Sequence, residues 1–372
     1  MLGIPQFEEK NILYPIELLY QKDDDTLVAS EISIGTMHTL ILCANGTLLS
    51  CGNSINGVLG IENVYDKITF PEKVGVDFFK TQNKELMRDN PQFKDYNDDF
   101  SLICQPTRIP TKIKYLDCST YNSAFITNSG DLYMSGLKDL KPAKVNEDGT
   151  PVDEDEEKDG ITEIINKITF FRAKVSFIAL GKNHAICIAE AKAYSWGSNE
   201  YGVCGLSGKS TEERFKIPMP IEEIRSPSKM ACVSDSHSMV LTVNGEIYSF
   251  GSNMYGKLGV ADLKKYFAIG VEPIELEPVL VKSVSDVKYI ACSNYHSACI
   301  SKIKNDNQDV QVMYTWGNGL DGKLGHGNTD DYYEPKKIDD FFSEINGTKM
   351  PNIIKIALGD EFSLALDEKG KL

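Results

Sequence analysis

One phrase returns six times along this chain, and a sequence that repeats itself at a roughly regular interval builds its fold from repeated structural units. Each copy starts with a small residue and two variable residues. Four of the six copies then have histidine, and an alternating apolar run follows. In such arrays each unit packs mainly on its neighbours, so the length of 372 residues does not by itself require several domains. The copies begin at Gly35, Ser119, Gly181, Ser234, Ser293 and Gly359.

Each copy has the composition of a β-hairpin. Its first run, such as HTLIL or HSMVLTV, is short and rich in apolar and β-branched residues. The pairs Asn45-Gly46 and Asn244-Gly245 then supply a turn that accepts positive φ. A second run, such as EIYSFG or MYTWG, ends in glycine. The fifth copy is interrupted by a polar insert at 302–311, which we expect to be a protruding solvated loop.

A glycine-rich segment follows four of the hairpins, in the pattern G-x-x-x-x-G-x-[Leu/Cys]-G, and predicts a tight connection. The linkers at 61–114, 137–178, 260–288 and 326–355 vary in length and have room for outer strands. We therefore predict an all-β propeller of four-stranded antiparallel blades forming one domain over residues 1–372. Six hairpin repeats are visible, which leaves six or seven blades open. Short helical inserts are expected at 72–94 and 331–345. Two longer inserts, of about 61–114 and 137–178, separate the early repeats.

Composition narrows the functional classes. The formal charge is −15 and no basic patch is apparent, which argues against direct nucleic-acid binding. No apolar run is long enough to cross a bilayer, and the first residues lack the pattern of a signal peptide. The nine cysteines include no CxxC pair. We therefore expect thiols in a reducing compartment, the cytoplasm or the nucleus.

The combined pattern resembles the repeat of the regulator of chromosome condensation family. The resemblance rests on [AC]-[GS]-x-x-H-[ST], a hairpin glycine, and Y-[ST]-[WF]-G-S-N-x-x-G-x-L-G, and is clearest from Ala179 to Gly325. It implies a β-propeller. Asn122 and Phe362 depart from it by replacing histidine, and the last repeat is truncated before its second strand. Two alternatives stay open for that repeat. It is truncated, in a ring with an irregular seam or in a chain cut from something longer, or the N-terminal segment closes it.

The repeated residues that look chemical are explained by repetition. Equivalent histidines on successive blades are spread apart and do not converge on a metal ion. Two segments match G-x-x-x-x-G-K, but leucine follows where a phosphate-binding loop needs Ser or Thr. We predict no catalytic residues, no metal and no cofactor. Structural roles are expected for His38, His184, His237, His296, Trp196, Trp316, Gly197, Gly251 and Gly317.

The variable residues before the repeat histidine are the remaining candidates for function. In propellers of the resembled family these residues lie in loops on one face, and in its Ran exchange factor acidic residues of such loops contact the GTPase. Tyrosines are good interface anchors, and acids steer basic partners. The predicted partner-binding residues are Tyr121, Asp235, Tyr295, Asp360 and Glu361.

Three functions are consistent with these residues. The first is a non-enzymatic scaffold that binds a protein partner through the loops of one face. The second is guanine-nucleotide exchange on a Ran-like small GTPase, although no short glycine-rich wedge is apparent. The third is a structural subunit of a larger assembly, for example a ciliary or ubiquitin-ligase assembly, with the helical inserts as docking elements.

Overall fold

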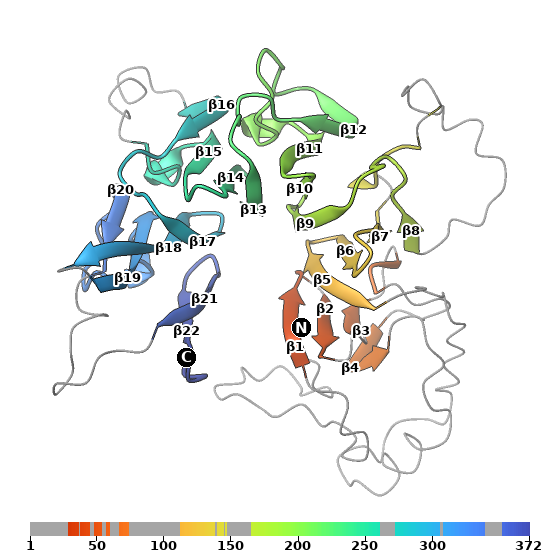
Figure 1. Ribbon diagram of the computed structural model, residues 1–372, viewed down its shortest axis with the longest axis horizontal. Helices are drawn as coiled ribbons and strands as arrows, with labels where there is room; N and C mark the ends of the chain where they lie inside the picture. The colour runs from red at the N-terminus through yellow and green to blue at the C-terminus, as the bar shows by residue number, and fades with distance from the viewer. Residues whose placement is uncertain are drawn as a thin grey trace, which may run out of the picture. The chain divides into compact units, whose positions relative to one another are not determined.

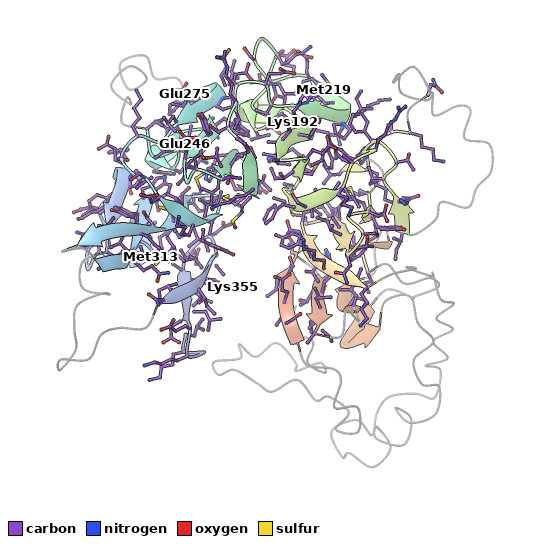
Figure 2. The ribbon with its side chains drawn as sticks, in the orientation of Figure 1. Lys192, Met219, Glu246, Glu275, Met313 and Lys355 are labelled. Carbon is purple, nitrogen blue, oxygen red and sulfur yellow. The ribbon has the colours of Figure 1, made fainter. Side chains whose placement is uncertain are left out.

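The computed structural model describes residues 29–59, 67–73, 112–146, 165–260, 272–338 and 352–372, apart from a few positions inside these ranges. The chain divides into two compact units. The first comprises residues 1–141 and 152–169, and the second comprises residues 142–151 and 170–372. The described part of the chain forms six antiparallel sheets, drawn in Figure 1. The all-β prediction is confirmed.

The first unit contains two four-stranded sheets in which the strands follow one another in sequence order. One sheet consists of β1 (Ala29–Ile34), β2 (His38–Cys43), β3 (Leu48–Asn53) and β4 (Lys67–Lys73). The other consists of β5 (Ile113–Cys118), β6 (Asn122–Thr127), β7 (Leu132–Gly136) and β8 (Ile165–Lys167).

The second unit contains three four-stranded sheets and one of two strands. The first of them consists of β9 (Val175–Leu180), β10 (His184–Ala189), β11 (Lys192–Ser198) and β12 (Arg214–Pro220). The next has β13 (Ser228–Val233), β14 (His237–Thr242), β15 (Ile247–Ser252) and β16 (Ile274–Leu280). The third has β17 (Val287–Cys292), β18 (His296–Asn305), β19 (Gln308–Gly317) and β20 (Tyr332–Lys337). The last described pair is β21 (Ile353–Leu358) and β22 (Ser363–Asp367).

The core of the second unit lies between neighbouring sheets, because the second strand of each blade is covered on both faces. All six residues of β14 are buried, and so are all six of β10. Met239 and Leu241 of β14 pack in one cluster with Ile290 and Trp316 of the following sheet. Sheets packed face to face in this way explain why these strands are buried throughout instead of alternating between buried and exposed residues.

The repeat is preserved in the strand register. In five sheets the first residue of the second strand pairs with the glycine that closes the third strand, as in His237 with Gly251. The pairing of the first strand with the second strand also has a register shift near the start of the first strand. In β13, for example, the shift lies between Ser228 and Met230. Such a bulge increases the local twist of the strand.

Two expectations are wrong. The insert at 302–311 is not a loop, because β18 and β19 remain paired as far as Asn305 and Gln308. Ile303 and Val310 continue the strand alternation there, and the two residues pair with each other. The helical insert expected at 331–345 begins instead with β20, the outer strand of its blade. In general the linkers hold outer strands, as predicted.

Several expectations fall on residues outside the described ranges. These are the helical insert at 72–94 beyond β4, the turn Asn45-Gly46, and the N-terminal segment expected to close the last repeat. The described helices are single 3₁₀ turns, η5 (Glu200–Gly202), η6 (Met254–Gly256) and η7 (Leu320–Gly322). None of the described helices has the length and apolar character needed to span a membrane.

Candidate protein-interaction face

The repeat histidines join neighbouring blades through a serine. His237 Nε2 lies 2.9 Å from Ser297 Oγ in the next sheet, and His184 Nε2 lies 2.9 Å from Ser238 Oγ. His296 with Ser363 and, in the first unit, His38 with Ser123 repeat the contact at 2.8 Å. The histidine thus belongs to one blade and the serine to the following one.

Each of these serines also donates to the glycine-rich segment of the preceding blade. Ser238 Oγ donates to the carbonyl oxygen of Val203 at 2.9 Å, and Ser297 Oγ donates to that of Lys257 at 2.8 Å. A serine hydroxyl has one proton, so the histidine Nε2 must carry the proton that it shares with the serine. This fixes the tautomer of the histidines, and burial lowers the pKa of His184 to about 3. The imidazoles are therefore neutral hydrogen-bonding groups, and no metal-binding cluster occurs among the described residues.

The glycine-rich segments are held from inside their own blades as well. A serine or threonine hydroxyl in the third strand donates to a backbone carbonyl oxygen of the glycine-rich segment that follows, at 2.6–2.7 Å. The pairs are Ser195 with Cys204, Ser249 with Leu258 and Thr315 with Leu324. The closing glycines have φ of +101° to +106° at Gly197, Gly251 and Gly317. At Gly251 a Cβ would lie 2.6 Å from the carbonyl oxygen of Ser236, so the third strand lies against the variable loop.

The second unit gathers its variable loops and its glycine-rich segments at one end of the strands. Lys257, in the segment after β15, donates from Nζ to Ser236 Oγ at 2.6 Å and to the carbonyl oxygen of Asn294 at 3.0 Å. Its side chain is 4% exposed, and burial lowers its pKa to about 8. Lys257 therefore connects two neighbouring loops from beneath.

Asn294 connects three variable loops at the surface. The backbone N–H of Asp235 donates to Asn294 Oδ1 at 2.9 Å, and the N–H of Asn294 donates to Asp360 Oδ1 at 3.2 Å. The amide of Asn294 also donates to both carboxylates, to Asp235 at 3.4 Å and to Asp360 at 3.2 Å. The loops of three successive blades thus form one connected surface, which we call the loop face.

Exposed aromatic rings lie beside these carboxylates. Tyr295 is 42% exposed and Tyr255, in η6, is 36% exposed. Their rings meet edge to face with centroids 6.4 Å apart. Lys323 Nζ lies 5.2 Å from the Tyr295 ring centroid, although Lys323 itself is buried. Tyr255 has φ of +60°, a left-handed conformation that is uncommon for a residue other than glycine.

The structure brings four of the five predicted partner-binding residues onto neighbouring loops of one unit. Asp235, Tyr295, Asp360 and Glu361 are exposed in the second unit. Tyr121 occupies the equivalent loop of the first unit, between β5 and β6, and is 37% exposed.

Sequence reasoning missed Asn294, Lys257 and Tyr255. The signal for Asn294 was its position among the variable pairs. Lys257 ends one of the two segments that match G-x-x-x-x-G-K, and Tyr255 lies within the same glycine-rich connection. Their contribution depends on contacts with the next blade, which periodicity does not show.

The remaining predicted residues pack inside the blades or between them. Trp316 is fully buried, and its Nε1 donates to the carbonyl oxygen of Lys257 at 2.9 Å. Trp196 is buried near Phe171, with ring centroids 6.5 Å apart. His326, outside the repeat register, lies 3.0 Å from Thr315 Oγ1 and against the Tyr332 ring.

The sheets, their register and the contacts between blades define a repeat β-propeller with four-stranded antiparallel blades. Residues 190–241, 244–300 and 312–366 match the Regulator of chromosome condensation (RCC1) repeat. The second unit thus contains three stretches that match this repeat.

Relatives and solved structures agree with this assignment. The chain is 30% identical over 203 residues to the E3 ubiquitin-protein ligase HERC2 of Homo sapiens, a match that covers 54% of this chain and 4% of HERC2. It thus spans a small part of that relative. The fold is similar to human WBSCR16, with a TM-score of 0.61 and 18% identity over 91% of this chain and 72% of the other.

A second solved structure with this fold is Prp20p from Saccharomyces cerevisiae, a protein described with its binding to Gsp1p and histones. The TM-score is 0.53 and the identity is 19%, over 91% of this chain and 83% of Prp20p. At this identity the likeness concerns the fold alone.

Proposed function

We propose that this chain is a non-enzymatic protein-interaction module that binds a protein partner through the loop face of its second unit. The observation that carries the proposal is the hydrogen-bonded connection of three loops through Asn294. A surface organised before binding loses less conformational entropy when a partner docks. The exposed tyrosines beside it are residue types that anchor interfaces.

Affinity capture with the tagged full chain tests this proposal. Replacing Tyr295 by serine should remove the specifically captured protein, while a matched change at the other end of the strands should not. Val243→Ser is that control, because Val243 is also exposed, at 57%, but lies in the turn after β14. Retention of every captured protein by Tyr295→Ser would contradict the proposal.

Guanine-nucleotide exchange on a Ran-like small GTPase is the second candidate. It is favoured by the two carboxylates on the loop face and by the likeness in fold to Prp20p. The test is the release of fluorescent GDP from Ran and related GTPases. We expect an exchange factor to accelerate release many-fold and to lose this activity in Asp235→Asn/Asp360→Asn. Release at the spontaneous rate would exclude exchange on the GTPases tested.

The proposal includes a reducing compartment, the cytoplasm or the nucleus. It is supported by the seven described cysteines, which are free thiols. Microscopy of the tagged chain, together with labelling of its thiols in cell extracts, tests this part.

A further inference from the structure

The exposed pair Tyr255 and Tyr295 and the carboxylates of Asp235 and Asp360 on the loop face are complementary to a positively charged side chain of a partner. We propose that the loop face binds an arginine-containing segment of the partner, with the guanidinium paired with the carboxylates of Asp235 and Asp360 and lying against the tyrosine rings. This inference rests on the proposed function and adds the chemistry of the ligand.

The apolar part of the surface is formed by η6 and the next variable loop. Met254 is 41% exposed, beside Tyr255, whose ring contacts that of Tyr295. These side chains belong to two successive blades, so the rings lie across the junction between them. The Lys323 ammonium lies 5.2 Å from the centroid of the Tyr295 ring, within the blade. The exposed parts of the two rings suit a guanidinium, which stacks on aromatic rings better than an ammonium does.

The charged part lies immediately beside Tyr295. Its neighbour Asn294 donates from one nitrogen to both Asp235 and Asp360, so the two carboxylates are held close together. Among the described residues neither carboxylate forms an ion pair. Lys257 lies within electrostatic reach of both, but it is buried beneath the loops and directs its Nζ to Ser236 and Asn294.

The next junction has acidic residues at the equivalent positions. Asp321 occupies in η7 the place that Tyr255 has in η6, with the same left-handed φ of +61°. Glu361 occupies the place that Tyr295 has in the preceding loop. An aromatic junction is therefore followed by an acidic one. A segment crossing both would meet an apolar contact first and carboxylates next, which favours arginine over a neutral or acidic side chain.

Fluorescence anisotropy with the full chain and short labelled peptides tests the inference. The probes share a Gly-Ser spacer and carry three arginines, three lysines, three glutamines or three glutamates. We expect the arginine peptide to bind at least about tenfold more tightly than the glutamine peptide and more tightly than the lysine peptide. Raising the salt concentration should weaken this binding.

Variants locate the binding on the surface. Asp235→Asn/Asp360→Asn should weaken arginine-peptide binding by about tenfold, and Tyr255→Asn/Tyr295→Ser should weaken it by a similar factor. The control Glu190→Gln/Glu222→Gln removes the same charge from exposed positions at the opposite end of the strands and should change binding less than about twofold. Thermal melting of each variant verifies that it is folded.

Three outcomes would overturn the inference. They are equal binding of the arginine and glutamine peptides, equal loss in the control variant, and no binding of any probe. If Tyr295→Ser still abolishes capture of a protein partner in any of these cases, the proposed function stands and only the arginine preference fails.

Discussion

His237 Nε2 donates a hydrogen bond to Ser297 Oγ of the following blade across 2.9 Å, and both side chains are completely buried. The serine hydroxyl in turn donates a hydrogen bond to the carbonyl oxygen of Lys257. One pair of residues thus connects two second strands and one glycine-rich segment. Three of the predictions below concern residues of this network or of its counterparts in other blades.

Ser297→Ala should destabilise the second unit by about 1–3 kcal/mol, because it leaves the buried N–H of His237 without an acceptor. The carbonyl oxygen of Lys257 keeps its bond from Trp316 and adds no comparable loss. Urea unfolding followed by tryptophan fluorescence measures this change, since both tryptophans, Trp196 and Trp316, lie in the second unit. Ser285→Ala is the control, because Ser285 is exposed and it is its backbone carbonyl that accepts from Ser301 Oγ. This change should alter stability by less than about 0.5 kcal/mol. Equal stability of the two variants would contradict the prediction.

Acid should unfold the protein partly through its histidines. The pKa of His184 is about 3 in the fold and 6.5 in its ordinary state, so the unfolded chain binds more protons as the pH falls below 6.5. The stability that neutral His184 contributes is fully present above pH 6.5. As the pH falls below 6.5, the free energy of unfolding decreases by up to about 1.4 kcal/mol per pH unit. His184→Asn should have a shallower decline, measured by urea midpoints between about pH 7 and pH 4.5. Parallel declines in the variant and the wild type would show that His184 is not the titrating group.

Gly251→Ala should cost at least about 3 kcal/mol, because φ is +106° and the added Cβ would collide with the backbone oxygen of Ser236. Gly208 also has positive φ, but nothing lies within 4 Å of the equivalent Cβ position. Gly208→Ala should therefore cost about 1 kcal/mol. Comparing the unfolding midpoints of the two variants separates close approach from backbone strain. Similar losses would mean that the contact with Ser236 is unimportant.

Lys257→Met should change how stability depends on alkaline pH. The pKa of Lys257 is lowered from 10.5 to about 8, so the unfolded chain binds more protons between these values. Wild-type stability associated with Lys257 therefore rises with pH through this window, by up to about 1.4 kcal/mol per pH unit. The free energy of unfolding of the wild type, minus that of Lys257→Met, should therefore rise from about pH 7.5 to about pH 9.5. A constant difference would show that Lys257 does not titrate in this window.

Local pattern was sufficient to predict most strands, because strand alternation and turn residues are encoded within one repeat. It failed at 302–311, where polar residues suggested a loop but Ile303 and Val310 continue a hairpin ladder. It failed also at 332–337, the described part of a segment expected to be helical, where β20 pairs with β19. In both places the pairing partner, not the local composition, determined the structure.

The candidate site, too, could be predicted only in part from the sequence. The variable pairs before each histidine identified Asp235, Tyr295, Asp360 and Glu361 from the repeat alone. The contacts that join them run through Asn294 and Lys257 to neighbouring blades.

The sequence by itself determined the β-hairpin repeat, the positions of its glycines and histidines, and the residues free to vary. The tertiary structure decided which residues meet, because the histidines, the serines and the loops find partners in a neighbouring blade, for the histidines and serines some 35 to 85 positions away. Such contacts depend on how whole sheets pack, and no periodicity within a single repeat specifies them.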